Sequence, residues 1–509
     1  MAMSQDAFET LVKRLEDKAR RHPRAYKFNV LLLALLGYGY LLAILGGCAG
    51  LIGLMAAGIA TGHGGLLLLA KNLGLPLLIL MGVVGRSLWV RLPPPDGIPV
   101  ARAQAPALFA VLDDVRRRQR GPAIHRVLLT DEFNAGIVQI PRLGLLGWNR
   151  NYLLLGLPLL QACGVAQLTA VLAHEYGHLS GAHGRFGAWI YRIRNTWGSL
   201  AGRLDREGHW GSGLITGFLN WYAPFFNAYT FVLARANEYQ ADRAAADTAG
   251  SRHLAEALVD FRLKMRLLAE RYWPQVYAAA DRLPQPSLLP HRDMAAALAQ
   301  RLAPEDAQTW LDAALAERTG LADTHPALAD RLARLDEPPR LADPAPASAA
   351  GQLLGDALPA LTAALDQTWQ QQVRAGWQER YHYVQTSTRR LQDLDERAAA
   401  VALTGDEPWE RARLVEEFRT PGEALALYEA ILQADPRHAG AAFAAGRCRL
   451  ALSDDAGLAC LDRAMELEDE AVLPACQLAW DYLHARDRGA EARRYREIYE
   501  RQVGIEELA

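Results

Sequence analysis

The sequence predicts a mainly α-helical protein with a small β-sheet, made of an N-terminal transmembrane helical hairpin, a central domain and a C-terminal module of helical repeats. Three observations predict this organisation. Residues 28–70 carry no charge, proline-free stretches with helical spacing occupy 165–178 and 235–242, and the composition becomes repetitive after Glu410. We therefore divide the chain into a basic N-terminus, two membrane spans, a central domain, a linker with a helical segment, and repeats, at 1–27, 28–91, 95–335, 336–405 and 406–509.

The N-terminal apolar region is long enough for two membrane-spanning helices. Residues 28–70 lack Asp, Glu, Lys and Arg, and 73–90 contain only Arg86, whereas a bilayer core needs about 20 apolar residues. Gly62-His63-Gly64-Gly65 (62–65) is a natural turn between them. A cleaved signal peptide is the alternative, because a basic segment precedes an apolar one. The first run is longer than a signal core and a second span follows it, so we expect a membrane-anchored hairpin.

The distribution of basic residues predicts that both ends of the hairpin face the cytoplasm. Basic side chains cluster before the first span and after the second, whereas the turn offers only Lys71. They are Lys13, Arg14, Lys18, Arg20, Arg21, Arg24, Lys27, Arg86, Arg91, Arg102 and Arg116 to Arg118. We expect a multi-pass protein of the cell membrane, in a bacterium the inner membrane, with a cytoplasmic central domain. The basic segment also suits contact with anionic lipid, although topology alone explains it.

Net charge and cysteine content argue against two other classes of protein. The formal charge is −2, and basic and aromatic residues are not interleaved outside the juxtamembrane segment, so nucleic-acid binding is not indicated. The cysteines number five, an odd total, and form no CxxC pair. A disulfide framework is therefore not expected, and buried apolar roles suffice for these residues.

The central domain contains the pentapeptide His174-Glu175-Tyr176-Gly177-His178, which matches the pattern HExxH. The apolar residues that precede it repeat at helical spacing, and positions i and i+4 of a helix lie on one face. Both imidazoles are thus able to bind one metal ion, with Glu175 beside them as a candidate general base. Two histidines on a solvated face are the alternative, and the apolar flanks argue against it.

A catalytic zinc ion needs three protein ligands and one open position, so a third donor must lie elsewhere in the chain. The candidate is Glu238, which shares a helix face with Asp242 at i, i+4 spacing. Asp242 is suited to accept the free ring N–H of a zinc-binding histidine. The alternative is an exposed acidic face that pairs with Arg235 and Arg243.

HEYGH followed by RANEYQAD resembles the membrane-bound zinc metallopeptidases of the HtpX and CAAX prenyl protease type. The resemblance covers residues 95–335. It implies a gluzincin-like metallopeptidase domain that holds one Zn²⁺ per chain. The implied roles are metal ligands for His174, His178 and Glu238, general base for Glu175, and orientation of a ligand for Asp242.

Two outer stretches resemble the same family. The segment THPALADR at 324–331 is similar to its THPxxxxR element, which implies a catalytic role for His325 near the metal. The alternative for this histidine is a structural residue before a proline turn. Asn134 and Ala135 resemble the start of the family's substrate-binding strand, although the family usually has an aromatic residue where this chain has Gly136.

The uncharged, aromatic stretch 213–234 lies between the two zinc motifs. It would nearly span a bilayer, but Asn220, Pro224 and Asn227 interrupt it. We expect it to be buried in the protein or to lie at the membrane interface. The small sheet is expected to include strands at 126–130, 136–140 and 152–157.

The composition changes after residue 335. Pro338-Pro339 and the run DPAPAS at 343–348 predict a linker, and helices are expected at 350–375 and 376–400. Residues 406–509 resemble tetratricopeptide repeats, because Asp435 and Asp469 stand one repeat length, about 34 residues, apart. Such repeats stack into a concave face that holds a peptide, so a protein partner is possible there. The alternative is a simple helical cap.

Together these features predict a membrane-anchored zinc endopeptidase that cleaves membrane or misfolded proteins at the cytoplasmic face, a role in protein quality control. An extended substrate would add as a strand beside the small sheet. Two alternatives remain open. One is a non-proteolytic scaffold whose repeats bind partners. The other is a prenyl-protein peptidase, which would need a large lipid-lined chamber although the chain has only two convincing spans.

Overall fold

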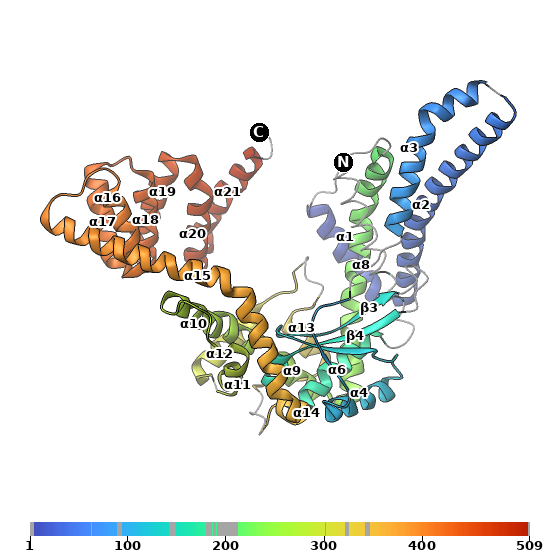
Figure 1. The fold of residues 1–509 in the computed structure, drawn as a ribbon, viewed down its shortest axis with the longest axis horizontal. Helices are drawn as coiled ribbons and strands as arrows, with labels where there is room; N and C mark the ends of the chain where they lie inside the picture. The colour runs from blue at the N-terminus through green and yellow to red at the C-terminus, as the bar shows by residue number, and fades with distance from the viewer. Residues whose placement is uncertain are drawn as a thin grey trace. The chain divides into compact units, whose positions relative to one another are not determined.

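The computed structural model describes residues 5–62, 64–88, 94–141, 149–179, 186, 190, 212–300, 302–320, 325–341 and 347–506. These residues form two compact units. The first comprises Met1–Tyr277 and Ser287–Gln372, and the second Ala278–Pro286 and Val373–Ala509. Helices predominate, and the described strands form a four-stranded sheet (Figure 1). A mainly helical protein with a small sheet, as the sequence predicts, is confirmed.

The first unit combines helices with one small sheet. They are α1 (Gln5–Arg21), α2 (Pro23–Ala60), α3 (Gly64–Leu88), α4 (Pro106–Gln119), α5 (Leu157–Ala162), α6 (Val165–Leu179), α8 (Ser212–Ala249), α9 (Ser251–Leu267), η2 (Leu268–Tyr272), α10 (Trp273–Ala278), α11 (Pro290–Ala299), α12 (Pro304–Ala316), α13 (Leu328–Leu335), α14 (Ala349–Leu354) and η4 (Gly355–Ala357). Helix α15 (Leu358–Ala400) begins in this unit and continues into the second.

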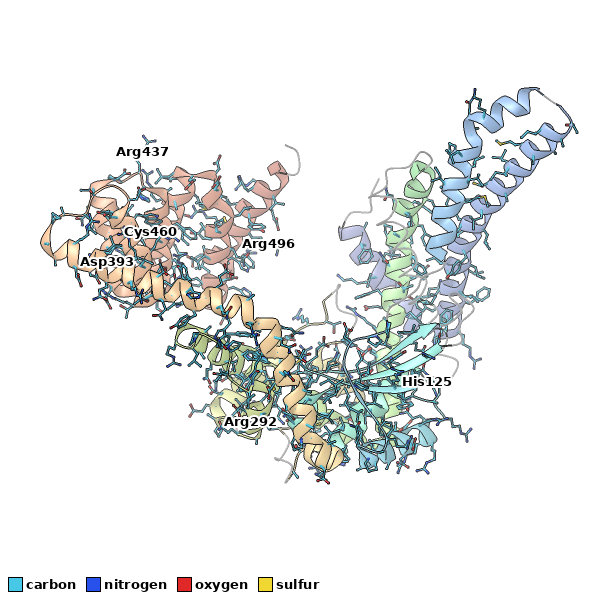
Figure 2. All side chains as sticks on the ribbon, viewed as in Figure 1. His125, Arg292, Asp393, Arg437, Cys460 and Arg496 are labelled. Carbon is cyan, nitrogen blue, oxygen red and sulfur yellow. The ribbon has the colours of Figure 1, made fainter. Side chains whose placement is uncertain are left out.

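The sheet has the strand order β1-β2-β4-β3. Its strands are β1 (Ile98–Val100), β2 (Arg126–Thr130), β3 (Ala135–Pro141) and β4 (Asn149–Gly156). The two central strands, β2 and β4, run parallel, and β1 and β3 pair antiparallel with them at the edges. β2 and β4 are rich in Leu and Val because both of their faces are covered. His125, labelled in Figure 2, lies just before β2, and its Nδ1 accepts from the backbone N–H of Asn151 at 3.1 Å.

The turn into β3 depends on a glycine in β4. A Cβ atom at Gly156 would lie 1.7 Å from the carbonyl oxygen of Glu132 and 2.8 Å from that of Asn134. Only glycine leaves room for this crossing of the chain. The backbone N–H of Gly156 donates to the Asn134 carbonyl at 2.8 Å, which fixes where β3 begins.

The N-terminal apolar region forms long helices. Within the described part of the chain, α2 is the one helix long and apolar enough to cross a membrane, and Lys71–Gly82 of α3 is a shorter apolar helical stretch. α2 packs against α3 and against α8 (Figure 1). His63, in the expected turn, lies outside the described residues. The structure thus contains one candidate membrane helix near the N-terminus.

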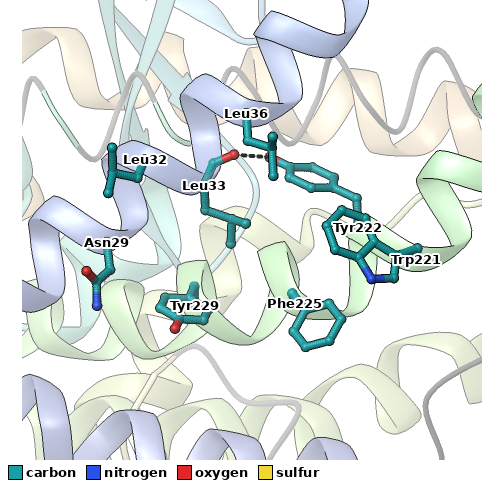
Figure 3. A pocket seen from close by; sticks show the side chains of 8 residues that line it. All are labelled: Asn29, Leu32, Leu33, Leu36, Trp221, Tyr222, Phe225 and Tyr229. Carbon is teal, nitrogen blue, oxygen red and sulfur yellow. Dashed lines mark hydrogen bonds between the residues drawn. The ribbon is translucent and has the colours of Figure 1, made fainter.

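Helix α8 runs without a break through Asn220, Pro224 and Asn227. The sequence predicts a buried or interfacial stretch here. Packing against α1, α2 and α6 supports the helix on several sides, and such tertiary contacts override the low helix propensity of the proline and asparagines. Its aromatic half faces α2 across an apolar groove of about 470 Å³ (Figure 3). The Tyr222 hydroxyl donates to the Leu33 carbonyl at 3.0 Å across this groove.

The second unit consists of successive helices that each contact the next. They are η3 (Ala279–Asp281), the C-terminal part of α15, α16 (Glu407–Phe418), α17 (Pro421–Ala434), α18 (Ala439–Ala451), α19 (Ala456–Leu467), η5 (Asp469–Ala471), α20 (Val472–His484) and α21 (Gly489–Glu506). α17 begins with a capping box, in which the Thr420 hydroxyl accepts from the Glu423 N–H and Pro421 occupies the first turn. A helical C-terminal region, as the sequence predicts, is present.

Helix α15 differs from the expectation of separate helices at 350–375 and 376–400. It continues from Leu358 to Ala400, and a short helix, α14, precedes it. Gly376 lies inside α15, where a single glycine costs about 1 kcal/mol relative to alanine and does not stop a helix. Of the expected linker, Pro338 and Pro339 are outside any helix, and residues 343–346 lie outside the described residues.

Candidate metal centre

The HEYGH segment forms the last turns of α6. Leu168, Leu172 and Tyr176 are almost fully buried on one side of this helix. The start of α6 is capped by the Gln167 side chain, which accepts from the Gly164 N–H at 2.9 Å. Continuous apolar packing therefore holds in place the helix that carries both histidines.

A glycine inside the motif allows α6 and α8 to approach closely. A Cβ atom at Gly177 would lie 2.9 Å from the Cα and 3.2 Å from the Cβ of Ala241 on α8. Both positions therefore need very small residues. The close approach brings Glu238, which lies three residues before Ala241, to the two histidines of α6.

Two histidines and one carboxylate converge at this contact. The Nε2 atoms of His174 and His178 are 3.2 Å apart. Glu238 Oε2 lies 3.6 Å from His174 Nε2, and Glu238 Oε1 lies 3.3 Å from His178 Nε2. Donors bound to a tetrahedral zinc at about 2.0–2.1 Å stand about 3.3 Å from one another. The three separations fit such an ion, and among the described residues this is the group of histidines, cysteines and carboxylates that converges in this way.

The candidate ligand His174 is oriented by a buried carboxylate. Asp242 is 2% exposed, and its Oδ1 lies 2.9 Å from His174 Nδ1. Arg331 of α13 donates to both carboxylate oxygens, from Nε at 2.9 Å and from Nη2 at 2.5 Å. Burial alone would raise the pKa of Asp242, but the hydrogen bonds from His174 and Arg331 hold it below its usual value. An ionised Asp242 keeps the proton of His174 on Nδ1 and leaves Nε2 free for a metal.

The candidate ligand Glu238 is held in its ionised form. Burial acts to raise its pKa, but hydrogen bonds with His178 and His325 outweigh burial and bring the pKa well below the usual value. A carboxylate must be deprotonated to bind a metal ion. The electrostatic surroundings of Glu238 therefore suit a ligand.

The candidate base Glu175 has the opposite shift. Its side chain is half-buried on α6, between the two histidines in sequence. Burial raises the pKa of Glu175 and the nearby Glu238 adds to the rise, while His174 and His178 act against it. A carboxyl group whose pKa moves toward neutrality is suited to accept and return a proton.

His325 lies directly against the ligand cluster. Its Nδ1 is 2.9 Å from Glu238 Oε2, and its side chain is 69% exposed. An exposed ring at a buried carboxylate faces both the metal centre and the solvent. The threonine of the same element, Thr324, lies outside the described residues.

Asn134 and Ala135 lie at the start of the edge strand β3. The Ala135 N–H donates to Asn134 Oδ1 at 2.9 Å, so this side chain caps its own strand. β3 packs against α6, the helix of both histidines. Asn134 is exposed and Ala135 is buried. Asn134 and Ala135 thus adjoin the cluster only because β3 packs against α6. The cluster itself consists of His174, His178, Glu238, Asp242 and His325.

The alternative interpretation, an exposed acidic face on α8, does not fit the structure. Glu238 is 6% exposed and Asp242 only 2%. Arg235 pairs with Glu16 of α1 instead of with either carboxylate. The carboxylates are buried because α8 packs its acidic face against α6 and α13.

Some residues that support the site carry no signal in the sequence. Gln119 Nε2 donates to the Ala173 carbonyl at 2.7 Å and to the Thr248 hydroxyl at 3.1 Å, and so joins α4, α6 and α8. It is the fourth residue of the run RRRQR, which is typical of a solvated helix end. Gly177 lies inside the motif at a position that the pattern leaves free.

A comparison with protein families gives one match at this region. The model of Peptidase family M48 matches residues 144–339. The matched range includes every residue of the cluster and ends before α14 and α15. It supports a peptidase in general, of a family that uses zinc, and the His174, His178 and Glu238 group is able to hold that ion. No curated protein matches the chain.

Proposed function

We propose that this protein is a membrane-anchored, zinc-dependent endopeptidase that hydrolyses peptide bonds of membrane or misfolded proteins at the cytoplasmic face. The observation that carries the proposal is the convergence of His174, His178 and Glu238 at separations that suit one zinc ion. Glu175 lies on the same helix as both histidines. The family match supports the peptidase class.

The three proposed ligands leave room for a fourth, open position, as catalytic zinc requires. His174 is kept in one tautomer by Asp242, and Asp242 is kept ionised by Arg331. Bound zinc supplies a Lewis acid that polarises the scissile carbonyl and lowers the pKa of water from 15.7 to about 7.

The proton transfers fall to side chains of this chain. Glu175 accepts a proton from the attacking water and returns it to the leaving amine. His325 donates Nδ1–H to Glu238, so its Nε2 carries a proton only when the ring is an imidazolium. The hydrogen bond with Glu238 raises the pKa of His325 and favours that form, in which Nε2 donates to the negative charge that develops on the carbonyl oxygen. A polar, exposed ring at this place supports catalysis better than a purely structural role before Pro326.

The substrate is proposed to bind as an extended strand along β3. In the described sheet, β3 has a partner strand on one side only. An edge strand offers free backbone groups, and backbone pairing depends little on substrate sequence. Asn134 and Ala135 begin this edge, and α6 lies against it.

The membrane anchor is proposed to be the hairpin of α2 and α3. α2 is a candidate membrane helix, and α3 packs against it. Lys13, Arg14 and Lys18 of α1 are exposed, in keeping with a cytoplasmic N-terminus. We retain the domain limits 1–27, 28–91, 95–335, 336–405 and 406–509, with the last as a tetratricopeptide-like module for a protein partner.

The decisive test replaces the base and keeps the ligands. Glu175→Gln removes the proton acceptor and changes no ligand, so we expect zinc to remain at one ion per chain while casein cleavage falls by about 10²–10⁴-fold. Detergent-extracted full-length protein is assayed for casein cleavage, and its zinc content is measured by elemental mass spectrometry.

The matched control is Glu305→Gln, at an exposed glutamate in the first turn of α12, which should leave both readouts unchanged. Full activity of Glu175→Gln would contradict the assignment of the base. Wild-type protein that binds zinc but cleaves nothing would favour the scaffold function, with the repeats as its binding part.

A further inference from the structure

Arg235 is a buried arginine close to the ligands that the proposed mechanism does not use. It lies on α8, one turn before Glu238, and its side chain is 10% exposed. Its guanidinium pairs with Glu16 of α1 and donates to the backbone carbonyl of Gly320. It also lies 4.3 Å above the ring of Phe231. One side chain thus joins the N-terminal helix, the ligand helix and the segment that precedes His325.

The segment around Gly320 is tied directly to the residues after His325. The Thr319 hydroxyl accepts from the Ala327 N–H at 2.8 Å and donates to Asp330 Oδ2 at 2.7 Å. Pro326 has a restricted backbone and connects Ala327 to His325. Any displacement of Thr319 and Gly320 is therefore passed to His325 through one hydrogen bond and two residues.

Two side chains of α8 form hydrogen bonds with this linked segment. Arg235 donates to the carbonyl of Gly320, and Glu238 is hydrogen-bonded to His325 at 2.9 Å. Three residues of a helix rise about 4.5 Å, so both hydrogen bonds come from the same short stretch of α8. Two contacts with α8 consequently fix the position of His325 beside Glu238.

The hydrogen bond from Arg235 to the Gly320 carbonyl depends in turn on α1. Helix α1 packs on α8 through Val12 and Leu15, which are buried. This packing brings Glu16 to Arg235 as its charged partner. A buried guanidinium without its carboxylate is costly and tends to rearrange toward water. The N-terminal helix therefore supports the arginine that holds Gly320.

We propose that Arg235 is a positioning residue: paired with Glu16 of α1, it fixes Gly320 and thereby places His325 at Glu238. The N-terminal helix is in this way a part of the active centre. The role of Arg235 in turnover rests on the proposed peptidase function, whereas its control over His325 does not.

The test uses graded substitutions in the full-length, zinc-loaded protein. Arg235→Met removes both contacts and keeps much of the apolar volume. Arg235→Lys keeps the charge, but a single ammonium lacks the fork that reaches two acceptors. Glu16→Gln removes only the partner's charge. The control is Asp17→Asn, because Asp17 is 51% exposed and pairs with Arg21 at 2.8 Å on the outer face of α1.

We expect the effect in kcat and not in zinc content or KM. A displacement of about 1 Å in a catalytic group lowers the rate by about 10²-fold, which is the size expected for Arg235→Met. Arg235→Lys and Glu16→Gln should be about tenfold slower on the same ground, and Asp17→Asn unchanged. Because the lysine and glutamine variants keep a polar group in place, they still test the proposal if the methionine variant does not fold.

A second readout does not need catalysis. Diethyl pyrocarbonate modifies accessible imidazoles, and its rate at His325 is followed by peptide mass spectrometry. Release from Glu238 should speed this reaction several-fold in the Arg235 and Glu16 variants and not in Asp17→Asn. If the wild type shows no peptidase activity, the proposed function fails while this readout still decides the placement of His325.

One pattern would overturn the proposal. If the variants melt at lower temperature but keep the wild-type kcat and the wild-type rate of modification at His325, Arg235 has only a structural role. Loss of zinc together with activity would equally overturn it, because the proposal leaves the metal ligands in place.

Discussion

Two helix pairs in this protein come together at glycine, α6 with α8 in the first unit and α18 with α19 in the second. A Cβ atom at Gly177 would lie 2.9 Å from the Cα of Ala241, and one at Gly446 would lie 2.9 Å from the carbonyl oxygen of Gly457. In both pairs the backbones are closer than a larger residue allows. The packing device is the same in the two units.

The two pairs differ in what the close contact brings together. Around Gly446 the neighbouring side chain is Leu461, and around Gly457 it is Leu450, and both leucines are buried. Gly177 contacts Ala241, and this contact brings together carboxylates and imidazoles that partner one another. Burying charged groups is expensive unless they are paired or bind a metal. Close packing alone therefore does not mark a functional site in this protein, and the buried charges do.

The largest effect should come from adding a methyl group at the close contact between α6 and α8. In Gly177→Ala the new methyl group meets the backbone of Ala241, so α6 must move and the three ligands separate. We expect zinc affinity to fall and casein cleavage to drop by about 10²-fold or more. Gly376→Ala is the control, because a Cβ at that exposed position of α15 meets nothing within 4 Å. Unchanged cleavage in Gly177→Ala would mean that the contact does not position the ligands.

A somewhat smaller effect is expected from the carboxylate that orients His174. Asp242→Asn keeps the shape of the side chain but loses the charge that Arg331 and His174 share. Zinc affinity should fall by about 10–100-fold, as measured by competition with a coloured chelator. Asp247→Asn, on the exposed side of the same helix, should bind zinc as the wild type does. Equal affinities for the two variants would refute the orienting role of Asp242.

The matching change in the second unit should affect stability and not chemistry. In Gly446→Ala the methyl group meets Gly457 and Leu461, and such overpacking costs about 1–3 kcal/mol. Hydrogen–deuterium exchange should therefore rise in the peptides of α18 and α19, while zinc content and casein cleavage stay the same. A change in cleavage per zinc-loaded chain would show that the two units are coupled, against the contrast drawn above.

The smallest effect concerns acid stability of the second unit. Burial acts to raise the pKa of Glu416, but hydrogen bonds from Arg447, at 2.7 and 2.8 Å, and from Tyr428, at 2.7 Å, hold it below the ordinary 4.5. Because the folded pKa is the lower one, this stabilisation is complete above the unfolded pKa and is lost as the pH falls through the folded pKa.

Glu416→Gln should thus destabilise the second unit at neutral pH and flatten its acid dependence. The readout is labelling of the buried Cys448 by 4,4′-dithiodipyridine, which reacts with thiols in acid. We expect faster labelling than wild type at pH 7 and a difference that shrinks below pH 4.5. A difference that grows in acid would contradict the sign of the pKa shift.

Local patterns in the sequence predicted the ligand helices well. The apolar spacing before His174 predicts α6, and the i, i+4 relation of Glu238 and Asp242 predicts a shared face. The structure brings these residues together as the two motifs imply. The strands near 126–130, 136–140 and 152–157 also appear, because alternation and β-branched or leucine-rich runs are local signals.

The remaining features depend on partners that are far apart in sequence. The pairing of Arg235 with Glu16 spans 219 positions, and Gln119 reaches Ala173 across 54. Neither residue type is unusual in a solvated helix, so the sequence holds no sign of the contact. The unbroken course of α15, expected as two helices, was missed for a related reason. Its continuity is decided by packing along the helix, which overrides the local weakness at Gly376.

The unbroken course of α8 also limits how this chain can vary. Its aromatic half and its carboxylates belong to one continuous helix, in which each residue turns the helix by about 100°. Inserting or deleting one residue between Phe231 and Glu238 would swing either the aromatic face away from α2 or the carboxylates away from α6. A change in the length of this stretch would therefore disturb one of the two faces. Related chains should keep the same count of residues here.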